Sequence, residues 1–342
     1  MKPAAPNPLK DWQADRASIR TIGHDLQRPE CILAERDGML CAADGRSGIV
    51  RIAPDGSQQL ITPYVEGPST GATSFENRYV QAQGSLPNGL AIASNGDLII
   101  ANCGTENLEC MTRDGHVHTL YTEIDGQPLG KANFVLRDSK NRIWLTVTTR
   151  ETPWTKQLNT RTADGYIALI DERGIRIVAD GFCGTNEVRL DANEEWLYVV
   201  ESTGWRISRL RVQPDGSLTD REIYGPTRLD GFPDGFAFDA FGNLWVTLIF
   251  TDQLVAITPD GEVLMLLDDS NPGTKARLFE QFEAHTLTPE VMQATHGTIA
   301  PWMASLTFGG PDLQTVYLGS LRGTTIPYFR SPVAGLPMQH WQ

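Results

Sequence analysis

The chain has 342 residues, 40% of them apolar and 21% charged, a balance typical of a globular protein with a buried core and not of a disordered chain. The formal net charge of −13 disfavours nucleic acid and anionic membrane surfaces as partners. No apolar run approaches the ~20 residues that a membrane span needs, and residues 1–13 lack the apolar stretch of a secretory signal.

Cysteine usage indicates a reducing compartment. The cysteines are odd in number and form no C-x-x-C motif, a pattern typical of free thiols and not of a disulfide framework. They are Cys31, Cys41, Cys103, Cys110 and Cys183. We therefore expect a cytoplasmic protein.

Six segments along the chain share one pattern, in which a polar residue opens a short apolar strand and a turn leads into a second strand. They begin at Glu30 (ECILAERDGMLCAAD), Asn88 (NGLAIASNGDLIIAN), Asn133 (NFVLRDSKNRIWLTV), Asn186 (NEVRLDANEEWLYVVES), Asp234 (DGFAFDAFGNLWVTL) and Ser305 (SLTFGGPDLQTVYLGS). In four of them an apolar residue follows ten positions after the opening residue, and in the fourth and sixth segments the turn is one residue longer. Such a shared register indicates an internal repeat.

The repeat predicts an all-β fold. Each segment alternates apolar and polar residues around Asp-Gly, Asn-Gly or related turns, as hairpins do, and further strand pairs, such as those from Gly48 and Gln253, bring each unit to about four strands. The units begin 45 to 71 residues apart with no helical period between them. This favours a six-bladed β-propeller with four-stranded antiparallel blades around a central channel. The last unit offers three strands before Pro332, and we expect residues 18–23 (SIRTIG) to supply the fourth and close the ring.

The domain organisation follows from the repeat. We expect an N-terminal extension over residues 1–17 and a single propeller domain over residues 18–342, with a partly helical insertion at about 270–303 before the last blade. Two further long connections, 62–86 and 149–164, are expected on the same face as the insertion. Long loops gathered at one end of a rigid scaffold are typical of a functional site.

The opening residues of the six segments are expected to meet at the channel mouth, because the innermost strand of each blade lines the channel. They are Glu30, Asn88, Asn133, Asn186, Asp234 and Ser305, and all six side chains carry oxygen. Two carboxylates in so small a space repel each other unless they share a cation, and Ca²⁺ or Mg²⁺ prefers carboxylate and amide oxygens. The alternative is that these residues only form turns, since Asn and Asp beside Gly are common there.

Three motifs within the segments carry a family resemblance. They are RPE at 28–30, TNEVRLD with YVVES within 185–202, and PDGFAFDAFGNLWV at 233–246. Over residues 27–328 the chain resembles the SMP-30/gluconolactonase/LRE-like family, which includes regucalcin and bacterial sugar lactonases. The resemblance implies a metal-dependent hydrolase that opens a small lactone ring, in particular a sugar aldonolactone.

The resemblance also implies the ligand set of one divalent metal ion. Family members hold the metal with a glutamate of the first blade, an asparagine of the fourth and an aspartate of the fifth, which correspond here to Glu30, Asn186 and Asp234. An asparagine of the third blade, matched by Asn133, lies at the metal or the substrate. Ca²⁺ is the expected ion, with Zn²⁺, Mn²⁺ and Mg²⁺ as alternatives. Lys131 stands where relatives such as regucalcin carry an arginine at the substrate.

These residues support a hypothesis for the reaction. The metal would polarise the lactone carbonyl, and Asp234 would act as the general base toward the attacking water. Lys131 and Asn133 would hold the substrate and stabilise the oxyanion. Asn88 would face the ring hydroxyls, and Ser305 would complete the substrate-binding set.

Two other functions fit the same pattern. One is a strictosidine-synthase-like enzyme or a paraoxonase-type esterase on the same scaffold, of which the latter often uses a histidine dyad near calcium. The other is a non-catalytic regulator that binds a divalent metal, because fold alone does not establish turnover. His285 and His296 of the insertion would either reach the channel mouth as an acid or base or lie on the surface. The sequence indicates no oligomeric state.

Overall fold

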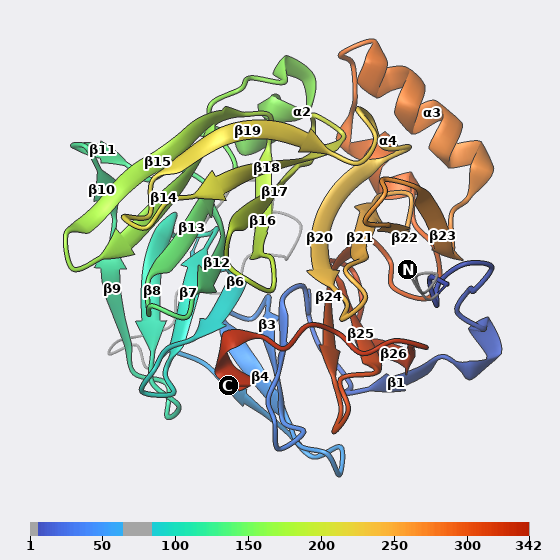
Figure 1. Cartoon of the computed structure of the whole chain (residues 1–342), viewed down its shortest axis with the longest axis horizontal. Coiled ribbons are helices and arrows are strands. Elements are labelled where there is room, and N and C mark those ends of the chain that lie inside the picture. Colours follow the sequence, from blue (N-terminus) through green and yellow to red (C-terminus); the bar gives the residue numbers. More distant parts are fainter. Residues whose placement is uncertain (1–5, 64–83, 342) are drawn as a thin grey trace, which may run out of the picture.

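The structure, a computed structural model, describes residues 6–63 and 84–341 and consists of six four-stranded antiparallel sheets around a central axis (Figure 1). From the channel outward, blade 1 consists of β2 (Ile32–Ala34), β3 (Leu40–Asp44), β4 (Gly48–Ile52) and β5 (Gln58–Ile61). Blade 2 consists of β6 (Pro87–Ile92), β7 (Leu98–Asn102), β8 (Asn107–Met111) and β9 (Val117–Tyr121). Blade 3 consists of β12 (Ala132–Arg137), β13 (Ile143–Val147), β14 (Gly165–Asp171) and β15 (Gly174–Phe182). Blades 2 and 3 are joined through a small hairpin of β10 (Glu123–Ile124) and β11 (Gln127–Pro128).

The remaining three blades have the same order. Blade 4 consists of β16 (Thr185–Leu190), β17 (Trp196–Glu201), β18 (Arg206–Val212) and β19 (Leu218–Tyr224). Blade 5 consists of β20 (Phe232–Phe238), β21 (Leu244–Ile249), β22 (Gln253–Ile257) and β23 (Val263–Asp268). Blade 6 consists of β24 (Met303–Gly309), β25 (Thr315–Ser320), β26 (Ile326–Arg330) and β1 (Arg20–Ile22). The innermost strands contact one another in the cyclic order β2, β6, β12, β16, β20, β24 and back to β2. The predicted six-bladed propeller is confirmed.

The ring is closed by the first strand of the chain. β1 pairs antiparallel with β26, with Arg20 opposite Tyr328 and Ile22 opposite Ile326. Strand β1 therefore completes blade 6 from the other end of the sequence, as predicted from the motif SIRTIG. This closure joins the two ends of the propeller and pairs an edge that the last blade would otherwise expose.

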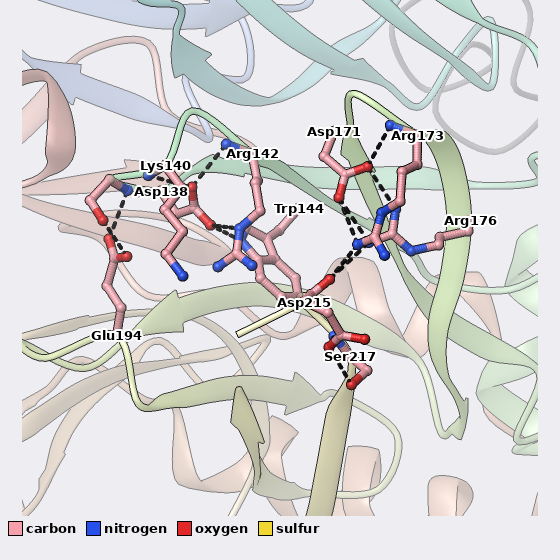
Figure 2. A network of polar contacts seen from close by, with 11 residues as sticks. Asp138, Lys140, Arg142, Trp144, Asp171, Arg173, Arg176, Glu194, Asp215 and Ser217 are labelled. Atoms are coloured by element: carbon pink, nitrogen blue, oxygen red, sulfur yellow. Dashed lines mark hydrogen bonds and ion pairs between the residues drawn. The ribbon is translucent and has the colours of Figure 1, made fainter. Parts of the chain in front are cut away.

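Buried aspartates stabilise the turns between the two inner strands of blades 3 and 5. The carboxylate of Asp138 accepts hydrogen bonds from the Nε of Arg142 at 2.6 Å and from the indole Nε1 of Trp144 at 3.0 Å (Figure 2). Asp239 does the same in blade 5, where Trp245 Nε1 donates at 2.9 Å. Each aspartate thus joins a tight turn to a fully buried tryptophan.

Polar contacts also join the turns of neighbouring blades on this side of the molecule. Glu194, labelled in Figure 2, accepts through its carboxylate from the amide and the hydroxyl of Ser139 at 2.8 and 2.6 Å. Nearby, Asp171 accepts from the guanidinium groups of Arg173 and Arg176 at 3.0 and 2.8 Å. Arg173 and Arg176 also donate to the carbonyl oxygen of Asp215 in blade 4. Together with the Ser139–Glu194 contact, these bonds join blades 3 and 4 at the face where the short turns lie.

The predicted insertion before the last blade is helical. It contains α3 (Pro272–Glu283) and α4 (Pro289–Ala294), which lie together at the periphery of the ring beside blade 5 (Figure 1). The N-cap side chain of Asn271 accepts from Gly273 N and Thr274 N, and that of Thr288 accepts from Val291 N. Each helix has proline in its first turn, where the missing N–H costs nothing.

The other two long connections differ in how much of them the structure describes. The connection 149–164 contains a short 3₁₀ turn, η2 (Trp154–Lys156), and α2 (Gln157–Thr160). Most of the connection 62–86, residues 64–83, lies outside the described residues. Among the described residues, no helix has the length and apolar character to cross a lipid bilayer.

Both terminal segments pack on the propeller. Trp12 lies 5.8 Å from Trp245 between ring centroids, and Leu9 is fully buried; the segment leads through η1 (Arg16–Ser18) into β1. The C-terminal segment, residues 331–341, passes beneath the far ends of the inner strands, where Met338 lies beside Leu136 and Arg189, and ends in η3 (Gln339–Trp341). Figure 1 shows this segment in red, crossing from blade 6 toward β4.

Candidate metal and active site

A β-bulge lies at the start of nearly every innermost strand. The pairing registers of β6, β12, β16, β20 and β24 with their neighbours each shift by one residue at this point. In β6 the unpaired residue is Asn88, and in β12 it is Asn133. A bulge turns the extra side chain out of the normal alternation, so the opening residues of different blades are directed to one place.

The asparagine and aspartate openers are parts of strands and do not form turns. Asn88 and Gly89 lie within β6, and Asp234 and Gly235 lie within β20. A Cβ on Gly89 would lie 2.4 Å from Phe134 Cα of the next blade, and a Cβ on Gly235 would lie 2.6 Å from the carbonyl oxygen of Ala304. Glycine follows the opener in these strands because the inner strands approach so closely, so the alternative reading as turn residues is wrong for these two pairs.

Five of the six predicted opening residues line one cavity at the channel mouth. They are Glu30, Asn88, Asn133, Asn186 and Asp234, and Lys131 lines the same cavity. About 70 Å³ of the cavity is open to water.

Arg28 and Asn88 fix the carboxylate of Glu30. Arg28 Nη2 lies 2.5 Å from Glu30 Oε2, and it also donates to Asn88 Oδ1 at 2.5 Å. Asn88 Nδ2 donates in turn to Glu30 Oε1 at 3.1 Å and to the carbonyl oxygen of Asn133 at 2.9 Å. These contacts join blades 1, 2 and 3 and hold one carboxylate at the cavity wall.

The second carboxylate comes from blade 5 and contacts blade 4. Asn186 Nδ2 donates to Asp234 Oδ1, and the same amide group donates to Ser202 Oγ at 3.2 Å. Asp234 is 4% exposed and Asn186 8% exposed. The predicted pair is therefore in direct contact and almost fully buried.

Several carboxyl groups lie close together at the site, where burial keeps water from solvating their negative charge. Burial raises the pKa of Asp234 well above its usual value, and the neighbouring carboxylates of Glu30 and Glu187 raise it further. Burial also raises the pKa of Glu30, although the charge of Arg28 opposes this. A divalent cation at this point would relieve the repulsion between the carboxylates.

The donor chemistry fits such a cation. Glu30, Asn186 and Asp234 offer carboxylate and amide oxygens, the ligands of hard ions such as Ca²⁺ and Mg²⁺. Asn133 Oδ1 is buried and has no hydrogen-bond partner among the described residues. An unpaired buried acceptor is costly, so this oxygen is available to a ligand in the cavity.

Lys131 brings a positive charge to the cavity wall, where it helps to lower the pKa of Glu30. Its side chain is 5% exposed, and Nζ donates to the carbonyl oxygen of Cys103 at 2.7 Å. The ammonium also lies 5.9 Å from the ring centroid of Trp154. An ammonium group held in this way can donate a further hydrogen bond into the cavity.

Ser305, for which the sequence predicts a substrate-binding role, lies apart from the other five opening residues. The bulge of β24 falls between Met303 and Ser305, so Ala304 occupies the position that asparagine holds in blades 2 and 3. Ser305 instead donates to Glu187 Oε1 at 2.6 Å, and it is not among the residues that line the described cavity. The shared register in the sequence was off by one residue here, because a bulge leaves no mark in the alternation of this glycine-rich segment.

Sequence reasoning missed a second polar layer below the openers. Glu187 is 3% exposed, lies 2.7 Å from Arg189 Nη2, and accepts from Ser305 and from the amide of Phe236. Arg189 lies 4.5 Å from the ring centroid of Phe134. The signal was present in the sequence, since Glu187 and Arg189 alternate with Val188 and Leu190 in TNEVRL and so lie on one face of an inner strand.

Sequence reasoning also missed several residues of the cavity wall. The polar ones are Arg28, Thr148, Gln157 and Thr203, and the apolar ones include Leu158, Ile249, Phe250 and Leu321. Arg28 was part of the RPE motif, but nothing in the sequence marked it as a cavity residue. The histidines of the insertion lie elsewhere: His285 and His296 are exposed, and no described histidine lines the cavity.

Together these features define a class of protein, the closed six-bladed propeller with a buried cluster of oxygen donors at one mouth of its channel. The chain belongs to the SMP-30/gluconolactonase/LRE-like family, whose model matches residues 70–268.

Curated relatives match about half of the chain. The chain is 23% identical over 161 residues to a 6-deoxy-6-sulfogluconolactonase of Pseudomonas putida, covering 46% of this chain and 45% of the relative. The chain spans about half the length of the curated relatives it matches.

Two solved structures show the same fold. A gluconolactonase of Xanthomonas campestris has a TM-score of 0.64 and 18% identity, covering 91% of this chain and 89% of that chain. A calcium-binding protein, regucalcin, of Agrobacterium tumefaciens str. C58 has a TM-score of 0.64 and 14% identity, covering 94% and 98%.

Proposed function

We propose that this protein is a metal-dependent lactonase that opens a small lactone ring by hydrolysis. The observation that carries the proposal is the buried oxygen-donor set of Glu30, Asn186 and Asp234 in a cavity that Lys131 and Asn133 also line. The names of the relatives, among them a 6-deoxy-6-sulfogluconolactonase, support a lactone as the substrate. The sugar aldonolactone expected from the sequence is part of this proposal.

The chain's own residues would divide the work of hydrolysis. A divalent ion held by Glu30, Asn186 and Asp234, with Asn133 beside it, would supply Lewis-acid polarisation of the carbonyl when bound; Ca²⁺ is the first choice for such oxygen donors. Asp234 accepts the proton of the attacking water as the oxygen adds to the carbonyl carbon. Lys131 Nζ donates to the oxyanion that forms.

Ring opening completes the reaction. The bond between the carbonyl carbon and the ring oxygen breaks, and the departing alkoxide takes the proton from Asp234. The product is a hydroxy acid, which releases a proton at neutral pH. Asn88 and Asn133 contact the polar groups of the ring and keep its carbonyl oriented toward Lys131.

The test separates metal binding from turnover. The protein is stripped of metal, reloaded with Ca²⁺, Mg²⁺, Mn²⁺ or Zn²⁺, and assayed by proton release with a panel of lactones, while calorimetry measures metal affinity. We expect Asp234→Ala to lose metal affinity and at least about 10³-fold in activity. We expect Lys131→Met to keep metal affinity and lose about 10²-fold in activity. Full activity in Asp234→Ala would refute the proposal.

A second candidate function is a non-catalytic regulator that binds calcium. The regucalcin structure, described as a calcium-binding protein, has the same fold. Metal binding that Asp234→Ala abolishes, together with no hydrolysis of any lactone or aryl ester, would favour this function. Preference for aryl esters over lactones would instead favour a paraoxonase-type esterase.

The cellular compartment belongs to the same proposal. All five cysteines are unpaired, and Cys31, Cys41, Cys103 and Cys110 are buried. Free thiols are typical of a reducing compartment, which supports the cytoplasmic location expected from the sequence.

A further inference from the structure

The cavity has two chemically different faces. The face built by blades 1 to 3 carries Arg28, Asn88, Lys131, Asn133 and Thr148. On this face Asn133 Oδ1 and Thr148 Oγ1 are buried without partners among the described residues. These two oxygens are free to bind polar groups of a ligand, and Thr148 Oγ1 can also donate to one.

The opposite face is apolar. It consists of Leu158 from α2, Phe232 from β20, Ile249 and Phe250 at the end of β21, and Leu321 after β25. Each of the five is 5% exposed or less. A ligand that contacts these five side chains therefore meets hydrocarbon on that side of the cavity.

The helical insertion packs against the apolar face from behind. All five residues of the face belong to one buried apolar cluster with Leu278 and Phe282 of α3 and with Val291 and Met292 of α4. Phe282 lies 4.5 Å from the ring centroid of Phe232, and Trp302 lies 5.1 Å from that of Phe250. The insertion thus makes this face rigid and leaves little freedom to place a polar group there.

From this division we infer that the substrate is a lactone with hydroxyl groups along one edge and a methyl or other short, oxygen-free substituent on the opposite edge. The inference rests on the proposed function and narrows its substrate class. The ring places its hydroxyls against Asn88, Asn133 and Thr148. Its alkyl group packs against Leu158, Ile249 and Leu321.

The physical reason is the cost of an unpaired hydroxyl. A hydroxyl pressed against the apolar face loses its hydrogen bonds to water and gains none in return. A methyl group at the same point gains from leaving water. One such group in an apolar pocket changes kcat/KM by about 10-fold to 200-fold.

Matched pairs of lactones test this inference. The first pair is δ-gluconolactone and its 6-deoxy analogue, which differ by one hydroxyl. The second pair is δ-valerolactone and δ-hexalactone, which differ by one methyl group. We expect kcat/KM, measured by proton release on the metal-loaded protein, to favour the methyl-bearing member of each pair by about 10-fold or more.

Substitutions in the apolar face of the cavity test whether this face causes the preference for the methyl-bearing lactone. Leu158→Asn and Leu321→Asn each place an amide on the apolar face and should bring the ratio within each pair close to one. Leu287→Asn is the matched control, because Leu287 is 5% exposed in the same apolar cluster but does not line the cavity. It should lower the thermal stability and leave the ratio unchanged, so loss of folding alone does not mimic the expected result.

The outcomes separate the inference from the function on which it rests. Hydrolysis of the lactones with no preference for the methyl-bearing members, or an equal effect of Leu287→Asn on the ratio, would overturn the inference and leave the lactonase intact. Absence of turnover with every lactone would refute the proposed function and the inference together.

Discussion

At the scale of single residues, the position of an aspartate relative to its strand decides whether it lines the cavity or stabilises a turn. Asp234 is turned into the channel by a bulge, and burial beside Glu30 and Glu187 raises its pKa. Asp239, five residues later, lies in the turn that follows β20 and accepts hydrogen bonds from Asn243 and Trp245. The carboxylate of Asp234 is available to a ligand, whereas the carboxylate of Asp239 is taken up by hydrogen bonds within the protein.

Asp239→Ala should cost about 3 kcal/mol of unfolding free energy, because several buried donors lose their acceptor at once. These donors include the amide of Asn243 and the indole N–H of Trp245. Urea denaturation followed by tryptophan fluorescence measures the loss. Asp55→Ala is the control, since Asp55 accepts from exposed Ser57 in a comparable turn, and it should cost less than about 0.5 kcal/mol. Equal costs for the two variants would contradict the role given to Asp239.

At the scale of elements, a buried carboxylate anchors the insertion to blade 5. Asp252, the residue before β22, accepts from the amides of Gly297, Trp302 and Met303 at 2.5, 3.1 and 2.7 Å. These amides belong to the segment that leads from α4 back into β24. The carboxylate thereby positions the insertion and, through Trp302 and Phe250, the apolar face of the cavity.

Asp252→Ala should loosen the return segment of the insertion. We expect the amides of Trp302 and Met303 to exchange with deuterium at least about 10-fold faster, because each lost acceptor leaves a buried donor that costs about 1–3 kcal/mol. Native-state hydrogen exchange measures this directly. Asp230→Ala removes an exposed carboxylate that pairs with Lys275 of α3 and should leave the same amides unchanged. Unchanged exchange in Asp252→Ala would show that apolar packing alone holds the insertion.

At the scale of the whole molecule, both ends of the chain close the propeller. β1 completes blade 6, and the C-terminal segment contacts blade 5 and then blade 1, where His340 Nε2 lies 2.8 Å from the carbonyl oxygen of Ala34. Trp341 Nε1 donates to the same carbonyl oxygen at 2.6 Å. Burial lowers the pKa of His340, and the guanidinium groups of Arg137 and Arg113 lower it further, while Glu35 and the Ala34 carbonyl oppose the shift.

This lowered pKa predicts how stability depends on pH. The unfolded chain binds a proton at His340 near pH 6.5 and the folded chain only at lower pH. The contribution of His340 is therefore fully present above pH 6.5 and is lost as the pH falls below that value toward the folded pKa. Unfolding free energies measured from pH 8 to 5 should fall less in His340→Gln than in the wild type. His24→Gln, which removes an exposed histidine, should follow the wild type.

Much of the fold was readable from the sequence because it depends on local patterns. Alternation around Asp-Gly and Asn-Gly turns predicted the hairpins, and the repeat of the opening residue predicted six blades and their meeting point. The helical insertion and the closing strand at residues 18–23 were predicted in the same way. Convergence of Glu30, Asn88, Asn133, Asn186 and Asp234 on one cavity followed from radial symmetry alone.

Other features were decided only by tertiary structure, because they arise where distant segments meet. A one-residue bulge moved Ala304 into the opener position and Ser305 into contact with Glu187, and no local pattern distinguishes the two registers. The apolar face combines Leu158, Phe232 and Leu321 from three separate parts of the chain. From the sequence, hydrophobic residues at these positions cannot be distinguished from residues of the protein core, because packing against protein and packing against a ligand require the same kinds of side chain.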